Sequence, residues 1–150
     1  MKTVIPFVLA TLLTQLVMAQ EKKIIFVCEH GAAKSVIAAS YFNKMAKERN
    51  LDYVAECRGT FPDSDVSPGV KDGLTKDKVF DHNIKPQKLL ISDTATVERI
   101  ILFTPLPPEL KTNIKTENWS NIQNVDAEYE KRRDAIIKKI TELLDSLEKQ

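Results

Sequence analysis

The nine residues VCEHGAAKS, Val27–Ser35, join a short apolar run to an amphipathic segment. The apolar run, Lys23–Val27, has the sequence KIIFV, which is typical of a strand buried on both faces of a parallel sheet. From residue 35 to about residue 50, apolar or small residues recur at helical spacing and charged residues fill the remaining face. The stretch therefore predicts a strand, a loop and a helix in succession, with Cys28 at the end of the strand.

Four later segments extend this pattern along the chain. Residues 53–57 predict a second short strand, and residues 99–104 predict a third one that Pro105 ends. Ser-Pro at the start of residues 67–80 predicts a helix, and residues 126–148 predict an amphipathic helix that packs on the sheet. Strands that alternate with helices at these separations predict an α/β domain with a parallel sheet covered on both sides.

The first nineteen residues have a different character from the rest of the chain. A lysine is followed by an apolar core and then by Val17, Met18 and Ala19, the small-residue pattern of a signal-peptidase site. An uncleaved membrane anchor or a buried strand is the alternative, but the apolar run is short for a span. We expect a signal peptide at residues 1–19, cleavage after Ala19, and a domain at residues 20–150 that is exported to the periplasm or secreted.

Composition limits the functions that this domain can have. The 150 residues are 43% hydrophobic and carry a net charge of +1. This balance predicts one globular domain and gives no reason to expect nucleic acid as a partner, or a membrane surface after signal cleavage. The sequence leaves the oligomeric state open.

The loop after the first strand is the expected place for a site, because ligands of α/β sheets bind beyond the carboxyl ends of the strands. Backbone N–H groups of such a loop, together with a helix N-terminus, bind an oxyanion. The same field stabilises a thiolate, so Cys28 is a candidate nucleophile; the alternative is a buried small hydrophobe. Ser35 is placed to cap the helix and to donate a hydrogen bond to the thiolate. The predicted oxyanion-binding residues are Glu29, His30, Gly31, Ala32, Ala33 and Lys34.

The segment FVCEHGAAKS resembles the Cys-x5-Arg-Ser loop of low-molecular-weight protein tyrosine phosphatases and of the related thioredoxin-linked arsenate reductases. The segments ECRGT, DSDVSPGVKDGL and ENWSNIQN with YEKRRDAIIKKITELL resemble later parts of that family, in the same order. The resemblance covers nearly all of residues 20–150. It implies a three-layer α/β sandwich, with a four-stranded parallel sheet and helices on both faces.

This resemblance implies a two-step phosphoryl transfer, in which the loop cysteine attacks phosphorus and the loop arginine clamps the equatorial oxygens. By position, Cys28 is the nucleophile, Ser35 is its hydrogen-bonding partner and Lys34 replaces the arginine. No cofactor or metal is implied, and the partner is a phosphate-like oxyanion or a phosphorylated substrate. The implied function is a cysteine-dependent phosphomonoesterase; the alternative is a non-catalytic protein that binds phosphate or a phosphorylated partner. The arsenate reductase relay needs further cysteines after the third strand, and FTPLPPEL contains none.

Two departures from the family pattern affect the chemistry. Lysine is a point charge where arginine presents a planar fork, and losing such a donor lowers rates by roughly 10²- to 10³-fold. Counting from Trp119 places Gln123 and Asn124 at the family's Asp-Pro pair, and neither side chain is an acid. Asp126 and His30 are therefore the candidate proton donors.

A third departure concerns the second cysteine. Gly31 takes the place of the family's loop asparagine, and Cys57 aligns with a serine that supports that asparagine. Adjacent parallel strands would bring Cys57 close to Cys28, so Cys57 is a candidate redox partner in a reversible disulfide that protects the nucleophile.

Overall fold

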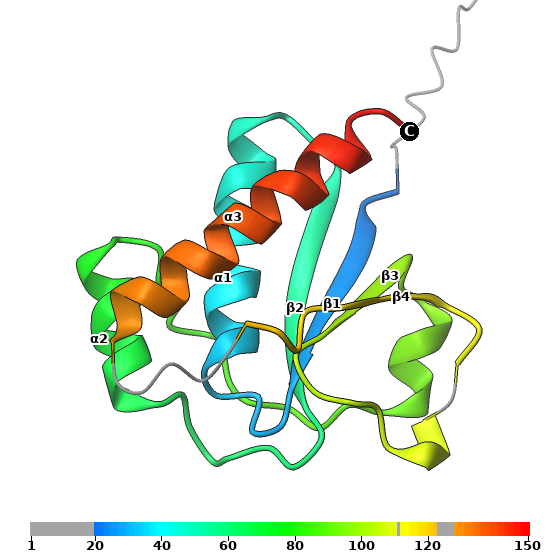
Figure 1. The fold of residues 1–150 in the computed structure, drawn as a ribbon, viewed down its shortest axis with the longest axis horizontal. Coiled ribbons are helices and arrows are strands. Elements are labelled where there is room, and N and C mark those ends of the chain that lie inside the picture. Colours follow the sequence, from blue (N-terminus) through cyan, green and yellow to red (C-terminus); the bar gives the residue numbers. More distant parts are fainter. Residues whose placement is uncertain (1–19, 111, 123–127) are drawn as a thin grey trace, which may run out of the picture.

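The computed structural model describes residues 20–110, 112–122 and 128–150. Its sheet has four strands, all parallel, in the order β2-β1-β3-β4 (Figure 1). The elements in chain order are β1 Lys22–Cys28, α1 Lys34–Glu48, β2 Tyr53–Gly59, α2 Pro68–Lys76, the 3₁₀ helix η1 Ile91–Ala95, β3 Arg99–Leu102, the 3₁₀ helix η2 Pro108–Leu110, β4 Lys115–Asn118 and α3 Tyr129–Leu147. The predicted α/β class and the four-stranded parallel sheet are confirmed.

Helices cover both faces of the sheet, but they differ in kind. Ile24 and Phe26 of β1 face a core that α1, α2 and α3 close, whereas Ile25 and Val27 face a smaller core on the opposite side. Leu89 and other apolar residues around η1 and η2 cover that second side. Figure 1 shows α1, α2 and α3 on one side of the sheet and η1 on the other. The predicted three-layer arrangement is confirmed, with 3₁₀ helices and loops as its thinner layer.

Burial explains which strands the sequence pattern finds. β1 lies between β2 and β3, so both of its faces are buried and its sequence is a continuous apolar run. β4 pairs only with β3, and its sequence KTEN is polar and mostly exposed. Because this strand has no apolar alternation, only the family resemblance implied it.

The helices α1 and α2 end where the backbone enters the left-handed region. Asn50, with φ of 55°, follows α1, close to the predicted end. The predicted end of α2 at Phe80 is wrong, because the helix stops at Lys76 and Lys78 takes φ of 59°. The N–H of Val79 then donates to the carbonyl of Leu74, which closes the helix. Lysine gives no sequence cue for this turn.

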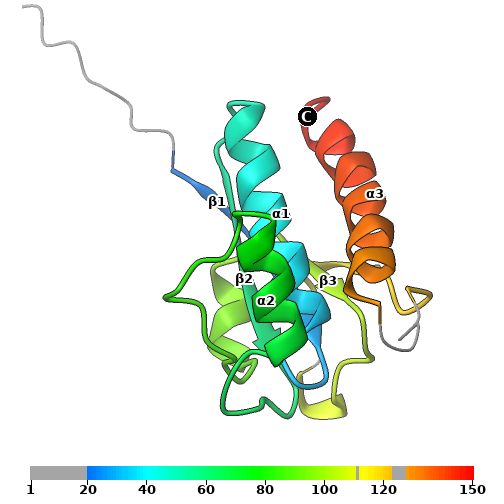
Figure 2. The same cartoon turned by 90° about the vertical axis from the view of Figure 1, so that its left-hand side faces the viewer.

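The strand order fixes where a ligand can enter. The chain passes from β1 through α1 to β2 on one side and later returns to β3 on the other side of β1. The carboxyl ends of β1 and β3 therefore border the crevice at which α/β sheets bind ligands. Figure 2 shows α1 beside α3, with α2 packed across the same helical layer. In the described part of the chain, every helix is too short or too polar to cross a membrane.

Candidate active site

The loop between β1 and α1 is held from outside by the segment that follows β2. Four loop carbonyls accept hydrogen bonds of 2.8–3.1 Å from backbone N–H groups of that segment: Cys28 from Thr60, Glu29 from Phe61, His30 from Asp63 and Ala32 from Ser67. In a trans peptide the carbonyl and the next N–H point in opposite directions, so the following N–H groups point away from that segment. None of the N–H groups of residues 29–34 donates to another group of the described residues. The loop therefore presents a set of unpaired donors suited to an oxyanion.

Two glycines bring the loop into direct backbone contact with β2. Gly31 has φ of 60°, and a Cβ built on it would lie 2.9 Å from the backbone nitrogen of Gly59. A Cβ on Gly59 would lie 2.8 Å from the nitrogen of Gly31 and 2.9 Å from the carbonyl carbon of His30. Since these atoms belong to the backbone, both positions require glycine. The Gly31–Gly59 contact sets the distance between the loop and the strand behind it.

Cys28 and Ser35 meet beneath this loop. The Cys28 Sγ lies 3.0 Å from the Ser35 Oγ, and both side chains are buried. The structure brings these two predicted residues together, but the predicted cap is wrong. Ala33 is the residue before α1, and Ser35, as the second residue of the helix, makes no capping bond. Its hydroxyl therefore remains available to stabilise the sulfur of Cys28.

A pocket of about 330 Å³ opens above Cys28 at the carboxyl edge of the sheet. It is lined by Cys28, Glu29, His30, Ala33, Lys34, Phe103, Thr104, Ser120 and Ile122. Gly31 and Ala32, which were predicted with the oxyanion-binding set, do not line this pocket. The first packs against Gly59 and the second is fully buried. The described residues contain no group of three or more His, Cys, Asp or Glu side chains that would hold a metal ion.

Lys34 supplies the cation of this pocket. Its Nζ donates to the carbonyl of Ile122 at 3.4 Å and lies 5.7 Å from the ring centroid of Phe103. Burial lowers the pKa of Lys34, while the negative charge of a Cys28 thiolate acts in the opposite direction. The ammonium group is thus partly desolvated, which strengthens its attraction for an anion that enters the pocket.

Of the two candidate proton donors, His30 and Asp126, the structure describes only His30. His30 is at the rim with 57% of its side chain exposed, and its Nδ1 lies 3.3 Å from Oδ1 of Asp63. Its ring is therefore within reach of a leaving group at the mouth of the pocket. Asp126, like Gln123 and Asn124, lies outside the described residues.

Cys57 lies on the same face of the sheet as Cys28, but the two thiols are free. Cys57 is opposite Phe26 in the register, and Cys28 is opposite Gly59. With strands about 4.8 Å apart and a rise of about 3.3 Å per residue, this offset separates the two Cα atoms by about 8 Å. A disulfide needs about 4.4–6.8 Å, so the predicted bond requires movement of a strand.

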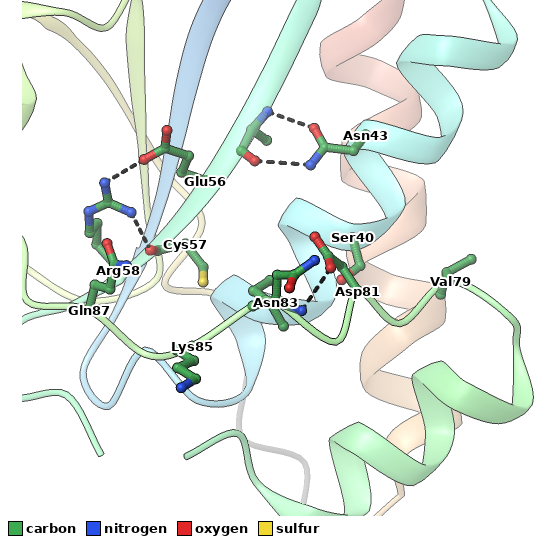
Figure 3. Close-up of a pocket in the computed structure, with 12 residues that line it drawn as sticks. Ser40, Asn43, Glu56, Cys57, Arg58, Val79, Asp81, Asn83, Lys85 and Gln87 are labelled. Carbon is green, nitrogen blue, oxygen red and sulfur yellow. Dashed lines mark hydrogen bonds and ion pairs between the residues drawn. The ribbon is translucent and has the colours of Figure 1, made fainter. Parts of the chain in front are cut away.

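The side chain of Cys57 borders a different pocket, of about 420 Å³, between α1 and the segment after α2 (Figure 3). Ser40 and Asn83 lie on the wall of the same pocket. Burial raises the pKa of Cys57 to about 11, so at neutral pH its thiol is protonated and a weak nucleophile. This separates its chemical role from that of Cys28.

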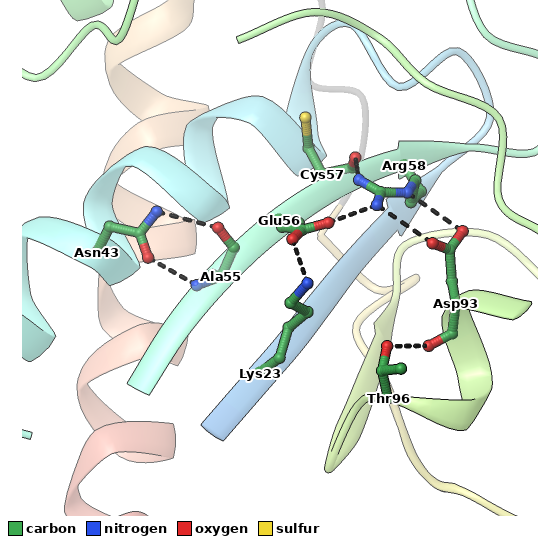
Figure 4. A network of polar contacts seen from close by, with 8 residues as sticks. All are labelled: Lys23, Asn43, Ala55, Glu56, Cys57, Arg58, Asp93 and Thr96. Atoms are coloured by element: carbon green, nitrogen blue, oxygen red, sulfur yellow. Dashed lines mark hydrogen bonds and ion pairs between the residues drawn. The ribbon is translucent and has the colours of Figure 1, made fainter. Parts of the chain in front are cut away.

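Arg58, next to Gly59, was not singled out by the sequence. Its guanidinium donates two hydrogen bonds of 3.2 Å to Asp93 and also contacts Glu56, which pairs with Lys23 at 2.5 Å (Figure 4). This network ties the end of β2 to β1 and η1, and so it fixes the strand against which the loop packs. The pocket residues Phe103, Thr104, Ser120 and Ile122 were also missed, since they join the site only through the parallel strands.

Neither a family model nor a curated protein sequence matches this chain. Solved structures do, over most of their length. A low-molecular-weight protein tyrosine phosphatase from Bacillus subtilis has 16% identity and a TM-score of 0.72, covering 85% of this chain and 98% of its own. A Cys-to-Ser mutant of the arginine phosphatase YwlE from Bacillus subtilis, solved with its active-site serine phosphorylated, has 15% identity and a TM-score of 0.74, with 85% and 97% covered. An arsenate reductase from Archaeoglobus fulgidus has 25% identity and a TM-score of 0.64, with 81% and 98% covered. The resemblance seen in the sequence is confirmed in three dimensions: the chain has the fold of the low-molecular-weight protein tyrosine phosphatases and arsenate reductases.

Proposed function

We propose that the protein is a cysteine-dependent phosphomonoesterase with an altered oxyanion loop. The observation that carries this proposal is the 3.0 Å contact between Cys28 and Ser35 beneath a loop whose backbone donors are unpaired in the described structure. The nucleophile and residues of the oxyanion loop thus line one pocket at the carboxyl edge of the sheet, and the buried Ser35 hydroxyl contacts the sulfur. Phosphatases among the structural neighbours support a phosphorylated substrate.

The proposed reaction has two displacements at phosphorus. The Cys28 thiolate attacks, an S–P bond forms, and the P–O bond to the leaving group breaks as that oxygen takes a proton. Water then attacks phosphorus, the S–P bond breaks, and phosphate leaves with the thiolate restored. Loop N–H groups and Lys34 stabilise the equatorial oxygens in both steps, and the Ser35 hydroxyl stabilises the thiolate. The first proton comes from His30 or Asp126.

Turnover of para-nitrophenyl phosphate and of a phosphotyrosine peptide by the reduced protein tests the proposal. We expect hydrolysis that Cys28→Ser abolishes, together with a mass increase of one phosphoryl group on Cys28 in acid-quenched samples. The Cys57→Ser variant is the matched control and should keep its turnover. Equal rates from the wild type and from Cys28→Ser would refute the proposed cysteine-dependent activity.

Lys34 makes a sharp prediction for the same assay. Lys34→Arg should raise kcat by about 10²- to 10³-fold, because a guanidinium gives two parallel bonds to the phosphoryl oxygens where an ammonium gives a point charge. Lys44→Arg, the same change at an exposed position of α1, should have no effect. A Lys34→Arg variant that is no faster than the wild type would show that the lysine does not limit the reaction.

One observation favours a second function, a non-catalytic oxyanion-binding protein of the same fold. The Lys34 ammonium already donates to the Ile122 carbonyl, so it stabilises the phosphoryl oxygens of a transition state less than an unpaired arginine guanidinium would. Phosphate, vanadate and arsenate should then raise the melting temperature while turnover is absent. Failure of all three anions to stabilise the protein would refute this function as well.

We also propose that the domain is exported, to the periplasm or out of the cell. Residues 1–19, on which this proposal rests, lie outside the described residues. The N-terminal sequence of the protein recovered after export should begin at Gln20, because the small-residue pattern ends at Ala19. Recovery of the intact Met1 terminus from the cytoplasm alone would contradict export.

A further inference from the structure

A second hollow, of about 420 Å³, lies along α3 and adjoins the active-site pocket. Its lining residues are Asn121, Ile122, Lys131, Arg132, Ala135, Lys138, Lys139 and Glu142. We call this surface the α3 groove. Ile122 lines the groove and the active-site pocket alike, and its carbonyl binds the Nζ of Lys34. The two hollows therefore meet at one residue.

The α3 groove is strongly basic, with four cations in its lining against Glu142 alone. Two of the lysines have acidic neighbours: Lys131 pairs with Glu128 at 2.8 Å and Lys139 with Glu142 at 3.3 Å. Arg132 and Lys138 form no ion pair within the described residues. Positive charge is therefore left without a partner at Arg132, near the active site, and at Lys138, further along the groove.

Arg132 connects this charge to the catalytic pocket. Its Nε is buried and has no hydrogen-bond partner in the described part of the chain. Burial is the main cause of the lowered pKa of Lys34, and the positive charge of Arg132 lowers that pKa further. The two cations are thus close enough to repel each other, and a bound anion would relieve this repulsion.

The dimensions of the groove suit an extended peptide. Its helical residues run from position 131 to position 142, which at about 1.5 Å per residue is about 16 Å. An extended chain advances about 3.3 Å per residue, so four to five residues span this length. A single inorganic anion would occupy only a fraction of it.

We propose that the α3 groove selects phosphorylated peptides that carry acidic residues beside the phosphorylated one, with Arg132 binding the first carboxylate. This inference rests on the proposed function, since the phosphoryl group must occupy the pocket above Cys28. It assigns Arg132 and Lys138 to substrate specificity and leaves the chemistry to the loop.

Two fluorescent phosphotyrosine peptides test this proposal on the Cys28→Ser protein, which cannot hydrolyse them. One peptide carries four Asp or Glu residues on one side of the phosphotyrosine, and the other carries Ser and Gly there. We expect the acidic peptide to bind about tenfold more tightly in 50 mM salt, with the ratio falling as salt screens the exposed lysines. Arg132→Gln and Lys138→Gln should each lower the ratio to about threefold or less, whereas Lys149→Gln, beyond the end of α3, should not change it.

The outcomes separate the two proposals. Equal binding of both peptides by the Cys28→Ser protein would overturn the proposed selectivity of the α3 groove, but it would still support the phosphate site above Cys28. If neither peptide binds, the phosphate site and the groove both fail. Binding of the neutral phosphopeptide by Arg132→Gln shows that this variant is folded. Tight binding of an unphosphorylated acidic peptide, or of vesicles of anionic lipid in preference to the acidic phosphopeptide, would also overturn the proposal.

Discussion

The Gly31–Gly59 contact makes the most stringent prediction for the oxyanion site. In Gly59→Ala the new Cβ would lie 2.8 Å from the nitrogen of Gly31 and 3.1 Å from the carbonyl oxygen of Glu29. Ordinary contact begins at 3.4 Å, so the loop backbone must retreat by about 0.6 Å. All the crowded atoms belong to the backbone, so no side-chain rotation relieves the clash.

The size of the effect follows from this displacement. Overpacking of this kind costs about 1–3 kcal/mol of folding free energy. A retreat of 0.6 Å also lengthens the hydrogen bonds from the loop N–H groups to a bound oxyanion, and each bond to a charged group contributes about 1.5–3 kcal/mol. Loss of one such bond weakens vanadate or phosphate binding by about 10- to 100-fold, since about 1.4 kcal/mol corresponds to a factor of ten.

Calorimetric titration with vanadate, together with urea unfolding, measures both effects. Two other glycines provide controls in the same chain. A Cβ on Gly69 meets nothing within 4 Å, so Gly69→Ala in α2 should be neutral or stabilising by up to about 1 kcal/mol. A Cβ on Gly73 meets the Tyr129 ring at 2.5 Å, so Gly73→Ala should destabilise the fold without changing vanadate affinity. Wild-type vanadate affinity in Gly59→Ala would refute the reasoning that the glycine contact shapes the loop.

Three further predictions concern single side chains. Ser35→Ala removes the hydroxyl 3.0 Å from the Cys28 sulfur, so alkylation of Cys28 by iodoacetamide at pH 7 should slow by about tenfold; an unchanged rate would contradict its role. Burial raises the pKa of Asp77, but hydrogen bonds to its carboxylate, including one of 2.6 Å from the Tyr41 hydroxyl, outweigh burial and lower the pKa. The ionised carboxylate therefore stabilises the folded state at pH values above about 3.9, the pKa of Asp in the unfolded chain. Asp77→Asn should therefore be less stable at pH 7, and in urea unfolding its deficit should shrink as the pH falls below about 4; a deficit independent of pH would contradict this. Burial raises the pKa of Cys57 to about 11, so iodoacetamide at pH 7.5 should label Cys28 alone, and the denatured, unreduced protein should contain two free thiols by mass spectrometry.

Local sequence was sufficient for elements whose burial leaves a continuous or periodic apolar pattern in the sequence. The KIIFV run predicted β1 because a central strand is apolar on both faces, and Asn50 closes α1 because asparagine tolerates the left-handed backbone. The same reasoning failed at Lys78, which adopts that backbone without any favourable residue type. It also gave no strand at β4, whose polar and mostly exposed sequence has no apolar alternation.

For the candidate site, the sequence by itself determined the order of strand, loop and helix, and with it the placement of Cys28 and Ser35 near a helix N-terminus. These residues are only seven positions apart, so local geometry brings them together. Tertiary structure alone decided the rest. Parallel pairing of β1 with β2 placed Gly59 against Gly31, and packing of α3 on α1 brought the charge of Arg132 to Lys34. The physical reason is range: periodicity and backbone propensity act over a few residues, whereas the contacts that shape the loop and its basic surroundings join segments that are distant in the chain.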